Sequence, residues 1–380
     1  MSNEFKGLVI AIPTRNRAEM AINAIKSVFA YSESNVKLVI SDNSTDEKEI
    51  ELLSRFCSNL NNSRLNYIKP PESLAMPKHW DWIANYLLEN YDETHFAYLP
   101  DRVVFKKGAI NDLIEAIKIY PDEIISYNTD IVWDCEKPIK AYPENKPYKL
   151  TRITAEELIC AIADNIEAPR ALPRMLNNVA PRSILNELKS KYGNIFISLS
   201  PDYSFAFRIL ENYGSIIYCE KSLIINYGFN RSNGINFAKN NFKDDAADFL
   251  KNLDKKNDNI LFLAPIPELL TFYNGIIHEY YLVKNESGSQ KFKDINREKY
   301  LKRLEEETRK FININDRKKA VKVLIANGAK TKGEFYYFYK EFRKIFNIRK
   351  NFIAVRDIIF QKNKFKNSIE AIEYLNNQSS

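Results

Sequence analysis

Blocks of apolar and polar residues alternate in the first part of the chain. Residues 8–12 form an apolar run rich in β-branched side chains, which predicts a short buried strand. Residues 18–31 place apolar side chains at three- and four-residue steps, which predicts a helix. A second β-rich run at residues 36–40 predicts another strand. The order strand, helix, strand is typical of an α/β fold with parallel strands.

Each of these two strands is followed by a polar loop. Open parallel sheets bind ligands outside the carboxyl ends of their strands. The loop after the first strand carries Arg15 and Arg17, which suit the charge of phosphate groups. The loop after the second strand carries Asp42 and Asn43, which suit hydrogen bonds to a base or a ribose. Together the loops predict a nucleotide site.

Strands and helices continue to alternate further along the chain. Strands are expected at residues 65–69, 94–99, 123–128, 195–198, 215–219 and 223–227, and helices at residues 46–56, 78–87, 154–162, 182–192 and 204–211. Thr154 and Glu157 have the spacing of a capping box, and Gly193 is expected to end the helix before it. Residues 135–150 are rich in proline, lysine and tyrosine and are expected to form an exposed loop.

Beyond Lys239 the pattern becomes mainly helical. Helical spacing is found at residues 261–281, 297–312 and 317–326. Residues 333–362 mix aromatic and basic side chains, which favours either a helical bundle packed on the first domain or a helix at a membrane surface or on a partner. We therefore expect an α/β domain at residues 1–239 and a helical appendage at residues 240–380.

Composition narrows the class of protein. The chain has 380 residues, of which 45% are hydrophobic, so it can build a sizeable core and more than one domain. Its net charge is +7, which is either a solvated lysine-rich surface or an attraction to anions such as a nucleotide diphosphate, an acidic glycan or an anionic membrane. No recognised nucleic-acid-binding motif is present, so nucleic acid is not an expected partner.

The cysteines and the N-terminus favour a cytoplasmic location. The four cysteines, Cys57, Cys135, Cys160 and Cys219, are scattered and lack the spacing of a metal site or a disulfide framework. The first residues lack a signal-peptide pattern, and no run approaches the about 20 apolar residues of a spanning helix. Peripheral contact with the inner face of the membrane and homo-oligomer formation both stay open.

The two loop motifs resemble those of the family 2 glycosyltransferases. That family has the GT-A fold, a Rossmann-like nucleotide-sugar-binding domain with a mixed central sheet. Its turn after the first strand is matched by Pro13-Thr14-Arg15-Asn16-Arg17. The element after its second strand is matched by Ser41-Asp42-Asn43-Ser44-Thr45-Asp46, except that Ser41 replaces the first Asp. The resemblance covers roughly residues 7–234 and implies that Pro13, Thr14, Arg15, Asp42 and Asn43 bind the donor, with Asp42 at the base.

The resemblance also implies a metal ion. The family holds a divalent cation on an Asp-x-Asp element, whereas this sequence has Asp101 alone, between Pro100 and Arg102. Some family members hold the metal through a single Asp, with phosphate oxygens and water in the remaining positions, so Mn²⁺ or Mg²⁺ on Asp101 is expected, since both prefer oxygen ligands. Two alternatives are that Arg102 supplies part of the metal's charge and that Asp101 caps a turn. Lys78 begins a helix that lies over the nucleotide in the family, so it is either a phosphate contact or an exposed lysine.

The catalytic base is expected at the start of a later helix. In the family an acidic residue at a helix N-terminus takes this role, and Asp202 stands at the matching place, where it can also be an N-cap. Asp130 and Asp134 are the next carboxylates to consider. Residues 165–178 are expected to be irregular and near the acceptor. In the polar loop at 228–234, Arg231 and Ser232 can contact the leaving phosphate, or the loop is a plain surface turn.

These residues predict an inverting glycosyltransferase. It would move a sugar from a nucleotide-diphosphate sugar to a hydroxyl of a glycan or lipid-linked glycan, and family habit points to bacterial surface polysaccharide, either lipopolysaccharide or capsule. One rival is a sugar nucleotidyltransferase, which usually has a glycine-rich phosphate loop, and residues 13–17 contain no glycine. The other is a non-catalytic protein that binds nucleotide-sugars or glycans and has lost its metal site.

Overall fold

The computed structural model describes residues 4–31, 35–232, 234–235, 239–240, 263–330 and 364–378. The aromatic and basic segment at 333–362 lies outside them, so both interpretations of that segment stay predictions. Among the described residues, no helix is long and apolar enough to cross a bilayer.

The described strands form one mixed sheet. They are β1 (Leu8–Thr14), β2 (Val36–Asp42), β3 (Leu65–Ile68), β4 (His95–Tyr98), β5 (Val103–Phe105), β6 (Ile125–Trp133), β7 (Ile139–Tyr142), β8 (Leu150–Thr154), β9 (Asn178–Pro181), β10 (Ser215–Asn226) and β11 (Lys364–Phe365). The order is β11-β7-β6-β9-β4-β1-β2-β3, and β10 pairs with β5, β6 and β8. β4, β1, β2 and β3 run parallel, whereas β9 is antiparallel to both β4 and β6.

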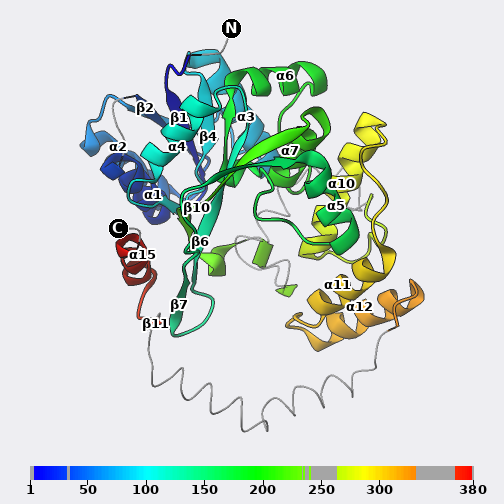
Figure 1. Cartoon of the computed structure of the whole chain (residues 1–380). Coiled ribbons are helices and arrows are strands. Elements are labelled where there is room, and N and C mark those ends of the chain that lie inside the picture. Colours follow the sequence, from blue (N-terminus) through cyan, green and yellow to red (C-terminus); the bar gives the residue numbers. More distant parts are fainter. Residues whose placement is uncertain are drawn as a thin grey trace.

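Helices cover both faces of this sheet (Figure 1). One face packs against α1 (Ala18–Tyr31), α2 (Glu47–Leu60) and α4 (Ala109–Ile119), and the other against α3 (Met76–Asn90), α5 (Ala155–Asn165), α6 (Arg182–Tyr192) and α7 (Pro201–Asn212). Residues 8–12 of β1 have no exposed surface, as a strand covered on both faces requires. The expected α/β class with a mixed central sheet is thus confirmed.

Several local signals act as expected. The Asp46 carboxylate caps α2 by accepting from the amide of Lys48 at 2.9 Å. The capping box of Thr154 and Glu157 is present at the start of α5. Gly193 ends α6 with a left-handed φ of 78°, a conformation that costs glycine little. These caps fix where helices start and stop, and so where the loops between them lie.

Three sequence expectations are wrong. Residues 135–150 are not all loop, because β7 lies within them, paired with β6 and β11, and two of its four side chains are buried. Residues 195–198 do not form a strand, because the amides of Ile195 and Phe196 donate to the Asp81 carboxylate instead of to a neighbouring strand. The two strands expected between 215 and 227 are one strand, β10, with register shifts that absorb the interruption.

The described residues beyond 239 are mainly helical, as expected. They include α10 (Phe272–Ser287), α11 (Arg297–Thr308), α12 (Ile314–Ala326) and α15 (Ser368–Asn377). α10 packs on α7, and α11 packs on α10 and α5, so their apolar residues join the core on that face of the sheet. α15 and β11 return to β6 and β7, at the other side of the molecule (Figure 1). The domain boundary at 239 stays a prediction.

Candidate active site

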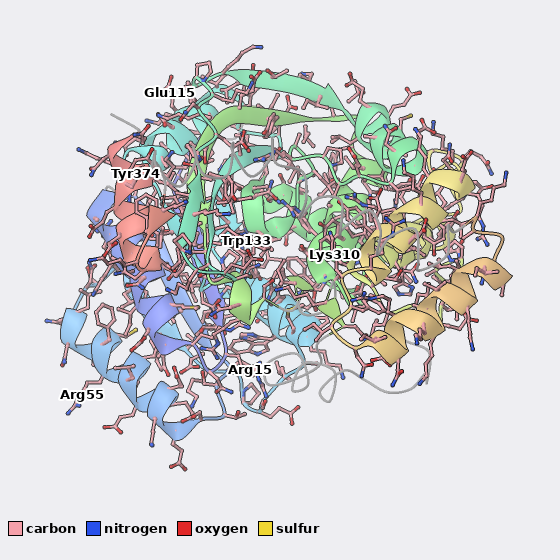
Figure 2. The ribbon with its side chains drawn as sticks, turned by 90° about the horizontal axis from the view of Figure 1, so that it is seen from below. Arg15, Arg55, Glu115, Trp133, Lys310 and Tyr374 are labelled. Carbon is pink, nitrogen blue, oxygen red and sulfur yellow. The ribbon has the colours of Figure 1, made fainter. Side chains whose placement is uncertain are left out.

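A cavity of about 700 Å³ lies where the carboxyl ends of β1 and β4 face the start of α7 and the first residues of α10. Figure 2 views the molecule from below and labels Arg15, in the loop after β1, and Lys310, which follows α11. Both residues line the cavity. The α/β part and the helical part of the chain therefore contribute to one site.

Most of the residues that the sequence singles out line this cavity: Pro13, Thr14, Arg15, Asn43, Asp101, Arg102, Asp202 and Ser232. Asp42, Lys78 and Arg231 are not among its lining residues. Asp42 is completely buried, Lys78 is exposed on α3, and Arg231 is half-buried at the end of a 3-10 turn, η2 (Phe229–Arg231). Their roles in donor binding stay predictions.

Hydrogen bonds join the loop after β1 to the loop after β10. Arg17 donates from a terminal nitrogen to the carbonyl oxygen of Arg231 at 2.8 Å, and Arg231 donates to that of Asn16 at 2.9 Å. Gly228, which begins the second loop, has a φ of 67°, and a Cβ there would lie 3.3 Å from the Cβ of Arg102. Glycine is therefore favoured, and it lets the loop after β10 lie against the loop after β1.

Asp101 is almost fully buried, at 4% exposed, at the end of β4. The Thr14 hydroxyl donates to one carboxylate oxygen at 3.0 Å, and Arg17 donates to the other at 3.5 Å. In the described part of the chain, no group of three or more His, Cys, Asp and Glu side chains is placed to hold a metal ion. Asp101 therefore offers a single carboxylate with the Arg17 guanidinium beside it, which is a poor donor set for the Mn²⁺ or Mg²⁺ expected there.

Arg102 turns away from Asp101 towards the end of β10. It donates to the side-chain oxygen of Asn226 at 2.6 Å, and its guanidinium lies 5.5 Å from the centre of the Phe229 ring. Burial, and to a lesser degree the charge of Arg17, lower the pKa of Arg102 to about 10. The Arg102 side chain therefore remains positively charged at neutral pH, although the nearby charge of Arg17 disfavours this.

The side of the cavity next to β2 is built from polar contacts. The buried Asp42 accepts a hydrogen bond from the Tyr67 hydroxyl at 2.6 Å. Asn43 exchanges two hydrogen bonds with the backbone of Leu74, at 2.8 and 2.9 Å. Arg15 donates to the Ser73 hydroxyl at 2.6 Å. These contacts fasten the loop before α3 to the end of β2, which gives the cavity a fixed wall.

Ser41 and His79 form a polar pair beneath this wall. Ser41, which stands where the family motif has its first Asp, places its hydroxyl 2.8 Å from Nε2 of His79. His79 is 3% exposed. Burial, with a smaller contribution from Arg15, lowers the pKa of His79 to about 3. The imidazole is therefore neutral at physiological pH, as suits the side chain of a core-edge residue rather than an acid catalyst.

Asp202 lies in the first turn of α7 and faces the cavity. It is not the N-cap, because Ser200 occupies that position and makes no side-chain capping bond. Burial raises the pKa of Asp202, although the Arg174 guanidinium, the first amides of the helix and Arg102 oppose this. A carboxylate with a raised pKa is a stronger base than an exposed one. The placement suits a group that accepts a proton within the cavity.

The other two carboxylates considered as bases have structural partners. Asp130 is completely buried and pairs with the Lys106 ammonium at 2.6 Å. Asp134 accepts from the amides of Gly228 and Phe229, each at 2.8 Å, and so anchors the loop after β10. Neither residue lines the cavity. Of these three aspartates, only Asp202 lines the cavity.

Arg174 approaches Asp202 from the segment before β9. Its guanidinium lies 5.7 Å from the centre of the Tyr203 ring and donates to the Tyr203 hydroxyl at 3.4 Å. Its buried Nε has no hydrogen-bond partner among the described residues. This segment was expected to be irregular and close to the acceptor, and it contributes Arg170 and Arg174 to the cavity.

The helical part of the chain supports the site from the other side. Glu279 of α10 is completely buried and accepts from the amide of Ser200 at 2.8 Å. Burial raises the pKa of Glu279 well above its ordinary value. The Glu307 carboxylate, also buried, accepts from the amide of Tyr273 at 3.0 Å and lines the cavity. The sequence pattern carried no signal for these residues, because they belong to helices whose packing depends on contacts distant in the chain.

Comparison with known proteins identifies no family. No family model matches the chain, and no curated protein matches it in sequence. GalNAc-T7, solved with UDP, GalNAc and Mn²⁺, is 11% identical over 76% of this chain and 56% of that protein, with a TM-score of 0.47. S. aureus TarS is 12% identical over 82% of this chain and 50% of that protein, with a TM-score of 0.42. The chain thus spans about half the length of these two structures, and its function is inferred from its own residues.

Proposed function

We propose that this protein is a glycosyltransferase of the GT-A type and a relative of family 2, which moves a sugar from a nucleotide-diphosphate sugar to a hydroxyl group. One observation carries the proposal. A single cavity at the carboxyl ends of parallel strands contains several arginine side chains and a half-buried carboxylate, Asp202, at the start of a helix. Arginines bind phosphate groups, and the carboxylate can accept a proton from a hydroxyl group.

The donor occupies the half of the cavity next to β1 and β2 in this proposal. Arg15 and Arg17 meet the diphosphate, with Ser232 and Arg231 covering it from the loop after β10. The base of the nucleotide lies against the wall that Asp42 and Asn43 help to hold. The sugar then points towards α7, because that is the direction in which the cavity extends.

The reaction is a direct displacement in which Asp202 is the general base. Asp202 accepts the proton of the acceptor hydroxyl, whose oxygen forms a bond to the anomeric carbon. The bond from that carbon to the phosphate oxygen breaks, and the nucleoside diphosphate leaves with the electron pair. Attack from the opposite face inverts the anomeric carbon and needs no covalent intermediate on the protein. General-base catalysis of this kind contributes about 10²- to 10⁴-fold.

The acceptor side is bounded by the segment before β9 and by α10 and α11. Leu176, Tyr273 and Glu307 line it, so residues from both expected domains would contact the acceptor. We take the acceptor to be a glycan or lipid-linked glycan of a bacterial surface polysaccharide, as the family resemblance implies. A cytoplasmic enzyme with peripheral membrane contact would meet such an acceptor.

Thermal unfolding with a panel of nucleotide-sugars tests the proposal. A donor at 100 times its dissociation constant should add about 2.7 kcal/mol to the free energy of unfolding. Arg15→Gln should weaken binding of that donor by about tenfold or more, the effect of losing one charged hydrogen bond. Arg55→Gln is the matched control, since Arg55 is exposed on α2, away from the cavity (Figure 2). A panel in which no donor stabilises the protein would refute the proposal.

The two rival functions predict other products. A sugar nucleotidyltransferase would release pyrophosphate from a nucleoside triphosphate and a sugar phosphate. A binding protein would be stabilised against heat by a donor but would leave the donor intact over many hours. A glycosyltransferase releases nucleoside diphosphate from the donor even without acceptor, because water enters the acceptor side. Chromatography of the three reaction mixtures separates these outcomes.

A further inference from the structure

We propose that arginine side chains of this chain, rather than a divalent metal ion, neutralise the diphosphate of the donor. This inference rests on the proposed function and goes beyond it, because it assigns the chemistry that the metal supplies elsewhere to Arg17, Arg102 and Arg174. Nucleoside diphosphate binding and sugar transfer then proceed without Mn²⁺ or Mg²⁺.

The one carboxylate at the expected metal position is already engaged. Asp101 accepts from Thr14 at 3.0 Å on one oxygen and from Arg17 at 3.5 Å on the other. A metal ion on Asp101 would have to displace the guanidinium and then lie beside two arginines, Arg17 and Arg102. Like charges so close together repel one another, most strongly where water is scarce.

Further ligands for a metal ion are lacking around Asp101. Its neighbours in the sequence are a proline and an arginine, neither of which is a metal ligand. The other cavity carboxylates are fixed elsewhere: Glu307 by the amide of Tyr273, and Asp202 at the N-terminus of α7. Over the residues that the structure describes, no group of three or more His, Cys, Asp and Glu side chains is placed to hold a metal ion.

The described lining of the cavity carries more positive than negative charge. Its cations are Arg15, Arg17, Arg102, Arg170, Arg174 and Lys310, whereas its carboxylates are Asp101, Asp202 and Glu307. One of the cations, Arg170, also pairs with Glu144 at 2.6 Å. The described lining is therefore net positive, which suits an anionic ligand such as the diphosphate of a nucleotide-sugar.

The charges of several cavity arginines act on one another. Burial is the largest cause of the lowered pKa of Arg102, and the charges of Arg17 and Arg174 lower it further, whereas Asp101 and Asp202 oppose them. The buried Nε of Arg174 lacks a hydrogen-bond partner in the described part of the chain. A bound phosphate would relieve the repulsion, and guanidinium groups match its oxygens in a planar, two-pronged geometry. The cavity is therefore arranged for a bare diphosphate.

Titration calorimetry of the full chain tests the inference. UDP, GDP, dTDP and ADP are titrated in excess EDTA and again in Mn²⁺, which needs no variant. The inference predicts that whichever nucleotide binds does so in EDTA, with a dissociation constant within about threefold of that in Mn²⁺. Binding that appears only with Mn²⁺ overturns the inference and leaves the proposed function standing. No binding of any nucleotide in either buffer overturns both.

Variants identify the groups that replace the metal. Arg17→Gln should weaken binding in EDTA at least tenfold, and Mn²⁺ should not restore it, whereas Arg17→Lys keeps the charge and should retain part of the affinity. Arg55→Gln should bind like the wild type. Circular dichroism checks that each variant is folded. Restoration of the Arg17→Gln variant by Mn²⁺ would show that a metal site exists and would overturn the inference.

Discussion

Replacing Asp202 by asparagine separates a catalytic role from a structural one. The substitution keeps the size of the side chain and removes its charge and its ability to accept a proton. If Asp202 is the general base, the rate of donor turnover should fall by about 10²- to 10⁴-fold. Because the proposed donor site lies at the loops after β1 and β4, the dissociation constant of the donor should change by less than about threefold.

The effect on stability has an expected sign. Burial raises the pKa of Asp202 in the folded protein, so folding favours the protonated form. Such a group contributes most to stability below its unfolded pKa, and the contribution is lost as the pH rises through the raised, folded pKa. At pH 7 the wild type therefore carries the cost of a half-buried charge. Asp202→Asn removes that cost together with the favourable helix-dipole contact, worth about 0.3–1 kcal/mol, so the variant should be about as stable as the wild type.

Two measurements decide between the roles. Release of nucleoside diphosphate gives the turnover rate across pH 4 to 8, and urea denaturation gives the free energy of unfolding. The wild-type rate should fall as the pH drops through the pKa of Asp202, and the variant should lack this decline. A variant that turns over at near wild-type rate but has lost about 1–2 kcal/mol of stability would show that Asp202 only supports the helix, and the reasoning would be refuted.

Two further predictions concern the support of the site. Glu279→Gln mimics the protonated acid that burial favours, so the stability of the variant relative to the wild type should increase as the pH rises. Urea denaturation at pH 5, 6.5 and 8 measures this difference, and a difference that shrinks with pH would contradict the prediction. Tyr67→Phe removes the hydroxyl that donates to buried Asp42 at 2.6 Å, so it should lower the free energy of unfolding by about 1.5–3 kcal/mol in the same assay. A loss below about 0.5 kcal/mol would show that Asp42 finds another partner.

The local elements of the fold are predictable from the sequence. The apolar run at 8–12 and the helical spacing at 18–31 depend on neighbouring residues alone, and both elements form where expected. The polar loops after β1 and β4 then have to meet at one edge of the sheet, because parallel strands end at the same edge. For this reason the order of the elements is enough to bring Arg15 and Asp101 to one cavity.

The remaining features depend on contacts distant in the chain. The Arg17 side chain reaches both Asp101 and the loop after β10, a separation that no periodicity reveals. Glu307 enters the cavity only because α11 packs on α10 and α5. The family motif predicts a metal at Asp101. The tertiary structure, however, decides which groups lie next to that carboxylate. The sequence can therefore locate the site but not its distribution of charge.

The bond that breaks in the donor tests the central proposal most directly. A nucleotide-sugar that binds the protein is incubated with it in water enriched in ¹⁸O, and the products are observed by ³¹P NMR and mass spectrometry. Glycosyl transfer to water breaks the bond at the anomeric carbon, so the label should appear in the released sugar and the nucleoside diphosphate should be unlabelled. Label in a phosphate group, or a donor that stays intact across the panel, would contradict the assignment of this protein as a glycosyltransferase.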